Sequence, residues 1–158
     1  AVVMGLNSLK VNKITIIGRN DNSLDKFIIN AKELSIKNNI LIQGINNQKL
    51  NVTQYIEEAH LIVNTTPIGM KREITEQENI PLGPEIWESL SNKTILYDLI
   101  YTPRPTNWLK LGQQKNCFTI DGLDMLVEQG ALSIKLWSGF NSVPTMTMKS
   151  SAKKHLMV

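Results

Sequence analysis

The 158-residue sequence has one cysteine, no long apolar run and no strong excess of either charge. The single Cys117 excludes an internal disulfide framework, and because it lies in an apolar run we expect a buried, unreactive thiol in a reducing compartment. No stretch approaches the ~18 apolar residues of a membrane-spanning helix, and no signal-peptide pattern is present. We therefore expect a cytoplasmic protein with no membrane partner.

Strongly basic segments and metal-ligand clusters are also missing. The net charge of +3 comes from scattered Lys and Arg residues, which alone argue neither for nor against nucleic acid. Without a basic block or a stripe of interleaved aromatic residues, we expect no nucleic-acid partner. His60 and His155 stand alone, with no cysteine or carboxylate at ligand spacing, so we predict no metal site.

The composition is that of an ordinary globular protein, with 42% hydrophobic and 20% charged residues. The length suffices for one domain with a sizeable core. Short, nearly continuous apolar runs rich in β-branched residues are typical of parallel strands covered on both faces. We predict five such strands, at 14–17, 40–42, 61–63, 94–97 and 117–120.

Helical patterns alternate with these runs and continue to the carboxy terminus. Strands that alternate with helices imply right-handed crossovers and a parallel sheet, so we predict a doubly wound α/β fold. The irregular stretch 65–83 is long enough to suggest a functional loop. The predicted helices span about 24–38, 53–59, 84–90, 105–114, 123–139 and 144–156.

The first residues resemble the inside of an amphipathic helix, with no cap residue and no strand before them. In a dinucleotide-binding fold, the first strand and its glycine-rich turn come immediately before such a helix. One interpretation is therefore a Rossmann-like sheet that is incomplete in this chain. The alternative, a frayed helix on a complete domain, stays open at this stage.

Gly18-Arg19-Asn20 ends the first predicted strand. At this place NAD-binding domains carry an acid for the ribose hydroxyl, whereas NADP-binding domains favour a nearby arginine. Arg19 offers a planar cation for a 2′-phosphate, and Asn20 can add a hydrogen bond. A solvated surface arginine is the alternative.

Two further turns follow strands and carry polar groups. In the segment 64–70, Pro67 and Gly69 shape the turn, and Asn64 can hold the backbone in an Asx-type turn. Thr65 can contact a ribose or a nicotinamide edge, although turn chemistry alone explains the same residues without a ligand. After the next strand, the Leu99 carbonyl can accept from a carboxamide and the Tyr101 phenol can reach a polyol or carboxylate.

Asp98 stands at the end of that strand, where we expect it to anchor its loop rather than act as a base.

The segment 121–129 joins the last strand to a helix. Gly122 permits a close approach of backbone or ligand that any Cβ would prevent. Met125 and Gln129 are one turn apart and share a helix face, just beyond the sheet edge at which α/β folds bind ligands. An ordinary turn before a core helix explains the same pattern without a ligand.

Taken together, these motifs and the segment 136–139 resemble the shikimate dehydrogenase family, and the resemblance covers nearly the whole chain. It implies an NADP-dependent oxidoreductase that reversibly reduces 3-dehydroshikimate to shikimate in aromatic amino acid biosynthesis. It also implies that Tyr101 and Gln129 contact this small-molecule substrate. The implied cofactor residues are Gly18, Arg19, Asn20, Thr65, Leu99, Gly122 and Met125. Gly18 and Asn20 depart from the family's Asn-Arg-Thr wording.

The resemblance also implies what this chain does not contain. Family members have an amino-terminal substrate domain with a catalytic lysine and aspartate, then a strand and a glycine-rich turn before the helix that begins here at Ala1. We therefore expect residues 1–158 to form a truncated NADP-binding domain that includes the carboxy-terminal helices. We assign no catalytic residue and expect the chain alone to be inactive and to bind NADP weakly.

Other interpretations remain at this stage. A quinate/shikimate dehydrogenase differs mainly in contacts outside this chain. A non-catalytic nucleotide-binding or interaction module has the same motifs. A methyltransferase-like α/β domain usually has an acid at the first strand tip, where Arg19 stands here. A homodimer of the full-length enzyme is an open alternative, which the sequence does not decide.

Overall fold

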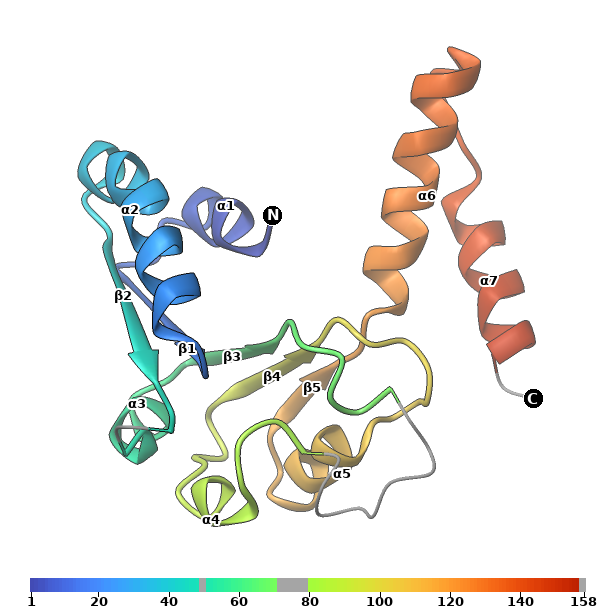
Figure 1. The fold of residues 1–158 in the computed structure, drawn as a ribbon. Coiled ribbons are helices and arrows are strands. Elements are labelled where there is room, and N and C mark those ends of the chain that lie inside the picture. Colours follow the sequence, from blue (N-terminus) through green and yellow to red (C-terminus); the bar gives the residue numbers. More distant parts are fainter. Residues whose placement is uncertain (49–50, 71–79, 157–158) are drawn as a thin grey trace. The chain divides into compact units, whose positions relative to one another are not determined.

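The computed structural model describes residues 1–48, 51–70 and 80–156, which form two compact units, Ala1–Tyr55 (unit 1) and Ile56–Val158 (unit 2). Every strand pairing is parallel, and helices separate the strands, which confirms an α/β fold with parallel strands (Figure 1). None of the described helices combines the length and apolar character needed to cross a membrane. The expected loop at 65–83 lies partly outside the described residues, at 71–79.

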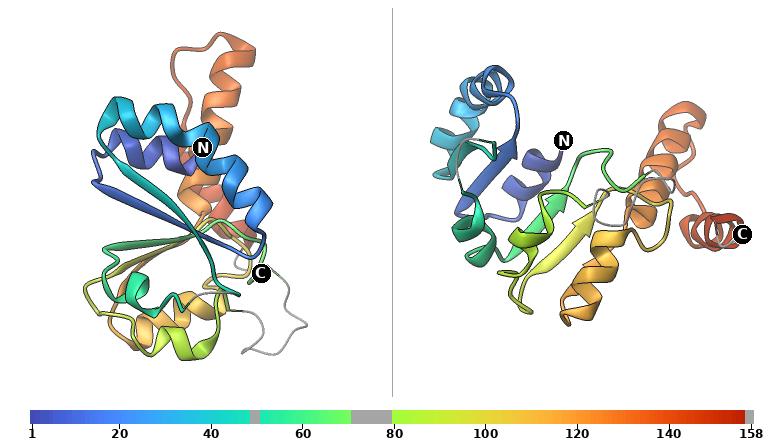
Figure 2. Two further views of the ribbon diagram at one scale, coloured as in Figure 1. Left: turned by 60° about the vertical axis from the view of Figure 1, so that its left-hand side comes forward. Right: turned by 60° about the horizontal axis from the view of Figure 1, so that its bottom comes forward.

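Unit 1 is a two-stranded parallel sheet with helices (Figure 2). Strands β1 and β2 pair over six residues, with Lys13 opposite Leu41 and Gly18 opposite Asn46. The prediction that the second strand covers 40–42 was too short, because Gln43 and Gly44 interrupt the apolar run while their backbone still pairs with β1. The elements are α1 (Val2–Ser8), β1 (Lys13–Gly18), α2 (Asp21–Asn38), β2 (Leu41–Asn46) and α3 (Thr53–Glu57), which crosses into unit 2.

Aliphatic packing holds unit 1 together. Ile14 and Ile42 from the two strands are buried with Ala31 of α2, and Val3 and Leu6 of α1 pack against them. The contribution of α1 shows that the amphipathic pattern at the start of the chain forms a docked helix. Burial of such side chains stabilises by roughly 25 cal/mol per Å² of apolar surface, so this cluster contributes to the stability of unit 1.

Unit 2 contains a three-stranded parallel sheet in the order β3-β4-β5. Leu61 lies opposite Ile95, which lies opposite Phe118, so the carboxyl ends of the strands meet at one edge. Most bounds match the predicted ranges within a few residues at each end. The elements are β3 (Leu61–Asn64), α4 (Pro84–Trp87), β4 (Ile95–Asp98), α5 (Asn107–Gln114), β5 (Phe118–Ile120), α6 (Leu123–Ser138) and α7 (Thr145–Leu156).

The core of unit 2 is built on aromatic and aliphatic side chains. The ring centroids of Trp87 and Trp108 lie 5.3 Å apart, with 34° between the ring planes, and Leu96 on the central strand is fully buried. Cys117 is also buried, and its Sγ donates to the Ser91 carbonyl at 3.3 Å. The expectation of a buried thiol is therefore confirmed. Burial raises the pKa of the Cys117 thiol, and the nearby Lys115 charge opposes this rise only in part.

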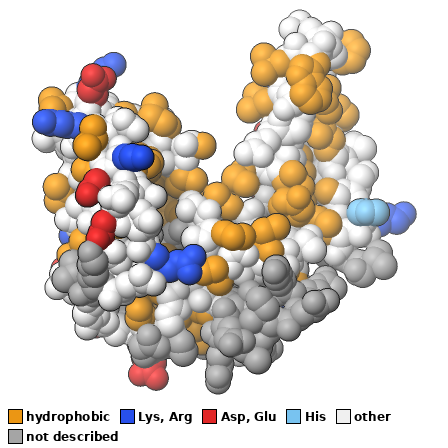
Figure 3. All heavy atoms as spheres, in the orientation of Figure 1, with side chains coloured by type: hydrophobic (Ala, Val, Ile, Leu, Met, Phe, Trp, Pro, Cys, Tyr) orange, Lys and Arg blue, Asp and Glu red, His pale blue; other side chains and the backbone are white. Residues whose placement is uncertain are grey.

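Helices α6 and α7 lie side by side beyond the sheet of unit 2 (Figures 1 and 2). The Lys149 ammonium and the Asp124 carboxylate join them at 2.6 Å. The first half of α6 buries Leu123 and Val127, whereas Trp137 at its far end is 85% exposed. Apolar side chains therefore line the outer part of this helix pair (Figure 3).

Candidate functional site

The predicted site residues fall into two groups, one in each unit, and each group lies at the carboxyl ends of parallel strands or, for residues 125 and 129, on the helix that follows. This is the edge at which open α/β sheets bind ligands. Unit 1 carries Gly18, Arg19 and Asn20, whereas unit 2 carries Thr65, Leu99, Tyr101, Gly122, Met125 and Gln129.

In unit 1 the turn that carries Arg19 is held on both sides. The Gly18 carbonyl accepts from the Asn47 N–H at 3.1 Å. The Asn20 side chain caps α2, because its Oδ1 accepts from the Ser23 N–H at 2.9 Å. Between them the Arg19 side chain is exposed, and its guanidinium makes no hydrogen bond or ion pair with any of residues 1–48, 51–70 and 80–156. The charge of Arg19 is thus available to an anion on a fixed backbone.

Sequence reasoning missed Asn46, which is 8% exposed beneath this turn. Its Nδ2 donates to the Arg19 carbonyl at 3.3 Å and to Oδ1 of Asp21 at 2.6 Å, and its Oδ1 accepts from the Gln48 N–H at 2.9 Å. The predicted strand stopped at residue 42, so Asn46 was not placed at a strand end. A longer strand prediction would have put an asparagine opposite Gly18 and drawn attention to it.

In unit 2 the turn after β3 forms around Asn64. Its Oδ1 accepts from the Thr66 N–H at 3.0 Å and from Thr66 Oγ1 at 2.7 Å, which confirms the predicted Asx-type turn. Gly69 in this turn has φ of +109°. Such a conformation favours glycine. Thr65 is exposed beside the anchored Asn64, where a ligand can reach it.

The turn after β4 is organised by Asp98, which is fully buried. One carboxylate oxygen accepts from Thr106 Oγ1 at 2.6 Å and from Trp108 Nε1. The other accepts from the Ile100 N–H at 3.0 Å and from Asn64 Nδ2 at 3.1 Å. Burial raises the pKa of Asp98 and these four hydrogen bonds oppose the shift. A carboxylate so fully engaged anchors the loop, as expected, and links the turns that carry Thr65 and Tyr101.

Gly122 lies directly against the backbone of the Leu99 turn. A Cβ at this position would come within 2.0 Å of the Leu99 carbonyl oxygen. The Gly122 N–H donates to the Ile100 carbonyl at 3.1 Å, and the Leu99 N–H donates to the Asn64 carbonyl at 3.2 Å. The predicted close approach at Gly122 is therefore confirmed for backbone, and three of the predicted positions, at residues 65, 99 and 122, are brought to one edge.

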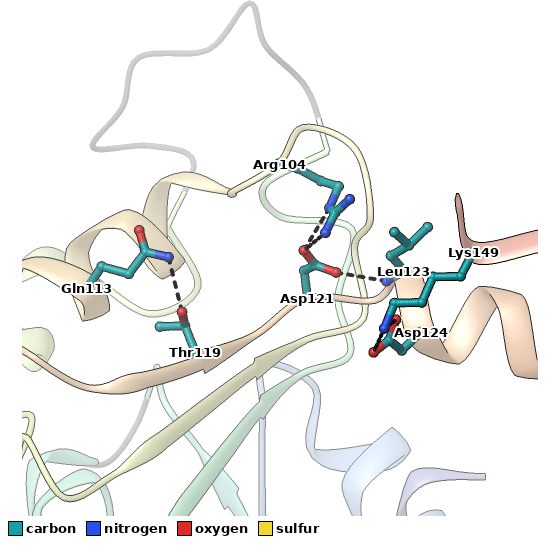
Figure 4. A network of polar contacts seen from close by, with 7 residues as sticks. All are labelled: Arg104, Gln113, Thr119, Asp121, Leu123, Asp124 and Lys149. Atoms are coloured by element: carbon teal, nitrogen blue, oxygen red, sulfur yellow. Dashed lines mark hydrogen bonds and ion pairs between the residues drawn. The ribbon is translucent and has the colours of Figure 1, made fainter. Parts of the chain in front are cut away.

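An ion pair fixes the other end of the Tyr101 segment (Figure 4). The Asp121 carboxylate accepts from Arg104 Nε at 2.7 Å and lies 2.6 Å from Arg104 Nη2. Its second oxygen accepts from the Leu123 N–H at 3.0 Å, at the start of α6. Tyr101 is 38% exposed between Asp98 and Arg104, so an accessible phenol stands on an anchored backbone.

Met125 and Gln129 follow on α6, one turn apart. Met125 is half-buried and Gln129 is exposed. An accessible amide and a soft thioether thus stand beyond the edge formed by the three turns of unit 2. This arrangement can present hydrogen-bonding groups to a polar ligand beside an apolar surface.

Comparison with known proteins points to one family. The sequence profile of the "Shikimate 5'-dehydrogenase C-terminal domain" matches residues 122–153. The chain is 46% identical over 156 residues to a shikimate dehydrogenase (NADP(+)) of Prochlorococcus marinus (strain MIT 9515), covering 99% of this chain and 53% of that protein. It thus spans about half the length of the curated relatives it matches.

Solved structures give the same result. A crystal structure of shikimate dehydrogenase in complex with NADP+ has a TM-score of 0.68 at 29% identity, over 93% of this chain and 48% of that one. The Mycobacterium tuberculosis shikimate dehydrogenase has a TM-score of 0.71 at 22% identity, over 94% and 50%, and so supports the fold alone. Over the part it spans, this chain belongs to the shikimate dehydrogenase (NADP+) family.

Proposed function

We propose that this chain is part of an NADP-dependent shikimate dehydrogenase, which reversibly reduces 3-dehydroshikimate to shikimate with NADPH. The observation that carries the proposal is the 46% identity over 156 residues to a relative of that name. The local geometry supports it, because most of the residues matched to the family's cofactor and substrate contacts lie at the carboxyl ends of parallel strands, and the others lie on the helix α6 that follows β5.

Arg19 is proposed to bind the adenosine 2′-phosphate of NADP. Its guanidinium is exposed and has no partner among the described residues, on a turn fixed at Gly18 and Asn20. Such a donor set fits a phosphate monoester, because a guanidinium can donate two parallel hydrogen bonds to it. Gly18 shapes the turn, and Asn20 contributes through the start of α2.

The turns of unit 2 are proposed to meet the nicotinamide and the substrate. Leu99 presents backbone to the carboxamide, Thr65 and Gly122 border the ring, and Met125 supplies an apolar contact. The hydrogen bonds of Asp98 hold these turns before a ligand arrives. Such preorganisation lowers the entropic cost of binding. Tyr101 and Gln129 are proposed to donate hydrogen bonds to hydroxyl or carboxylate groups of shikimate.

The cofactor, when bound, supplies the hydride that reduces the substrate carbonyl. In this chain no residue is assigned the accompanying proton transfer, because the family's lysine and aspartate have no matched positions among residues 1–158. The proposed role of the chain is therefore to bind and orient. We further propose that the strands belong to a doubly wound, Rossmann-like sheet that is incomplete in this chain. Among the described strands, β1 and β3 each have one unpaired side, as this proposal expects.

Titration of the 158-residue chain with NADP and NAD tests the cofactor assignment. We expect weak binding with NADP preferred, and Arg19→Met should weaken NADP binding about tenfold while NAD binding changes little. Lys37→Met is the matched control, because it removes the same charge from the other end of α2. Preference for NAD in the unmodified chain would contradict the assignment.

An activity assay tests the rest. We expect no reduction of 3-dehydroshikimate by the purified chain, and measured turnover would overturn the binding-only role. Shikimate should shift the NMR signals of Tyr101 and Gln129 more than quinate does; the reverse favours a quinate/shikimate dehydrogenase. If neither ligand perturbs them while NADP binds, a non-catalytic nucleotide-binding module explains the chain better.

A further inference from the structure

A buried asparagine connects the two charged residues that follow β1. One amide nitrogen, Nδ2 of Asn46, donates both to the Arg19 carbonyl at 3.3 Å and to Oδ1 of Asp21 at 2.6 Å. Its amide oxygen is engaged by the Gln48 N–H. Asn46 lies 27 residues from Arg19 and 25 from Asp21 in sequence. The backbone that carries the Arg19 cation and the carboxylate of Asp21 are therefore both held by a residue of the neighbouring strand.

The two charged residues have opposite effects on a phosphate at the ribose 2′ position. A guanidinium attracts it, whereas a carboxylate repels it. A carboxylate near this strand end is also the group with which dinucleotide-binding domains hold an unmodified ribose. Whether the turn selects a phosphorylated ribose thus depends on where Arg19 and Asp21 are held relative to each other.

We propose that Asn46 is a specificity-determining positioning residue, which sets the preference for a 2′-phosphorylated adenosine by fixing the Arg19 backbone and engaging the Asp21 carboxylate. The inference rests on the proposed function of Arg19 and adds a residue that does not itself touch the ligand. It applies to unit 1 only, since every contact involved lies between Gly18 and Gln48.

An asparagine fits this role better than its nearest substitutes. Aspartate keeps the acceptor for the Gln48 N–H but loses the donor and places a second carboxylate beside Asp21. Alanine loses all three hydrogen bonds and leaves the Arg19 carbonyl without its side-chain donor. In both variants the Arg19 turn retains its bond from Asn47 and the α2 cap at Asn20, so the turn should loosen rather than unfold.

The test uses the full 158-residue chain and two small probes, adenosine 2′,5′-bisphosphate and adenosine 5′-monophosphate, with dissociation constants from NMR titration. The readout is the ratio of the two constants. An unfolded fraction weakens both probes equally, so this ratio reports positioning and not stability. We expect Asn46→Asp to lower the preference for the bisphosphate about tenfold and Asn46→Ala to lower it about threefold.

Two further variants make the result specific. Asn51→Asp adds the same charge in unit 1 at an exposed residue, whose Oδ1 accepts from the Thr53 N–H at 2.8 Å, and it should leave the ratio unchanged. With Arg19→Met and Asp21→Asn both in place, Asn46→Ala should change the ratio less than about twofold, because coupled residues lose their interaction when the partners are removed.

The outcomes separate the two proposals. If the unmodified chain shows no preference for the bisphosphate, the proposed role of Arg19 fails, and the role of Asn46 fails with it. If the unmodified chain prefers the bisphosphate and both Asn46 variants keep that preference, only the positioning role is overturned. An undiminished effect of Asn46→Ala in the Arg19 and Asp21 double variant also overturns it.

Discussion

The two candidate binding edges are organised by different kinds of buried polar group. In unit 2 the hub is the fully buried carboxylate of Asp98, which accepts four hydrogen bonds from three segments of the chain. In unit 1 it is the neutral amide of Asn46, which holds one turn. A buried charge is far more costly to leave unpaired than a neutral amide. Substitutions at the binding edge of unit 2 should therefore destabilise the fold of that unit. Substitutions at the binding edge of unit 1 should cost less stability.

The tryptophans allow the two units to be followed separately. All three of them, Trp87, Trp108 and Trp137, belong to unit 2, so tryptophan fluorescence reports the unfolding of that unit. Amide hydrogen exchange in β1 and β2 reports the opening of unit 1. Variants of unit 2 can therefore be compared with matched variants of unit 1 or, for the ion pairs, with a second variant of unit 2.

The largest difference is expected between glycines at two strand-to-helix junctions. A Cβ on Gly122 would lie 2.0 Å from the Leu99 carbonyl oxygen, whereas one on Gly18 would lie 3.3 Å from the flexible Leu24 side chain. Gly122→Ala should therefore destabilise unit 2 by about 3 kcal/mol, the upper end of overpacking costs. Gly18→Ala should cost about 1 kcal/mol or less, because Leu24 can shift. Denaturant unfolding monitored by fluorescence and by hydrogen exchange measures both, and equal costs would contradict the comparison.

Smaller effects are expected for the two buried polar groups, Asp98 and Asn46. Asp98→Asn should destabilise unit 2 by about 2 kcal/mol, because an amide NH₂ placed among four donors leaves at least one of them unsatisfied. The groups that Asn46 engages lie near the surface. Asn46→Ala should therefore destabilise unit 1 by only about 1 kcal/mol. Denaturant unfolding compares the two variants, and a larger loss for Asn46→Ala than for Asp98→Asn would reverse the proposed difference between the edges.

The pH dependence of unit 2 follows from the raised pKa of Asp98. Because burial raises this pKa in the folded state above its ordinary value of 3.8, the folded chain binds the proton more tightly than the unfolded chain. The stabilisation of unit 2 that comes from this proton is therefore fully present below pH 3.8 and is lost as the pH rises through the pKa of Asp98 in the folded chain. The stability advantage of the unmodified chain over Asp98→Asn should shrink with rising pH, and an advantage that grows over this window would contradict the shift.

The smallest effects are expected for the two ion pairs in Figure 4. The side chains of Arg104 and Asp121 are mostly buried, at 22% and 23% exposure, whereas that of Asp124, the partner of Lys149, is 60% exposed. Arg104→Gln should therefore cost unit 2 about 1 kcal/mol, and Lys149→Gln less than about 0.5 kcal/mol. Thermal unfolding of the two variants compares them. A salt concentration of about 0.5 M screens exposed charges beyond a few ångströms. It should therefore reduce the loss of stability caused by Lys149→Gln but not the loss caused by Arg104→Gln.

Much of the fold was predictable because its signals are local. Short apolar runs separated by helical patterns predicted parallel strands, and Asn64 before Thr66 predicted an Asx-type turn. The glycine at 122 predicted a close approach, although not that the Leu99 carbonyl fills the space. The end of β2 was missed, because the pairing of Gln43 and Gly44 with β1 leaves no mark in the hydrophobic pattern.

The sequence by itself determined the parallel α/β class, the strand ends at which candidate binding residues stand, and the resemblance to shikimate dehydrogenases. Only the tertiary structure decided which groups hold those residues: Asn46 beneath Arg19, and Asp98 between the turns of Thr65 and Tyr101. The physical reason is distance along the chain. Periodicity and turn chemistry act between near neighbours, whereas Asn46 reaches 27 residues back to Arg19 and Asn64 reaches 34 residues forward to Asp98. Such partners are chosen by strand register and packing, which arise only when the chain folds.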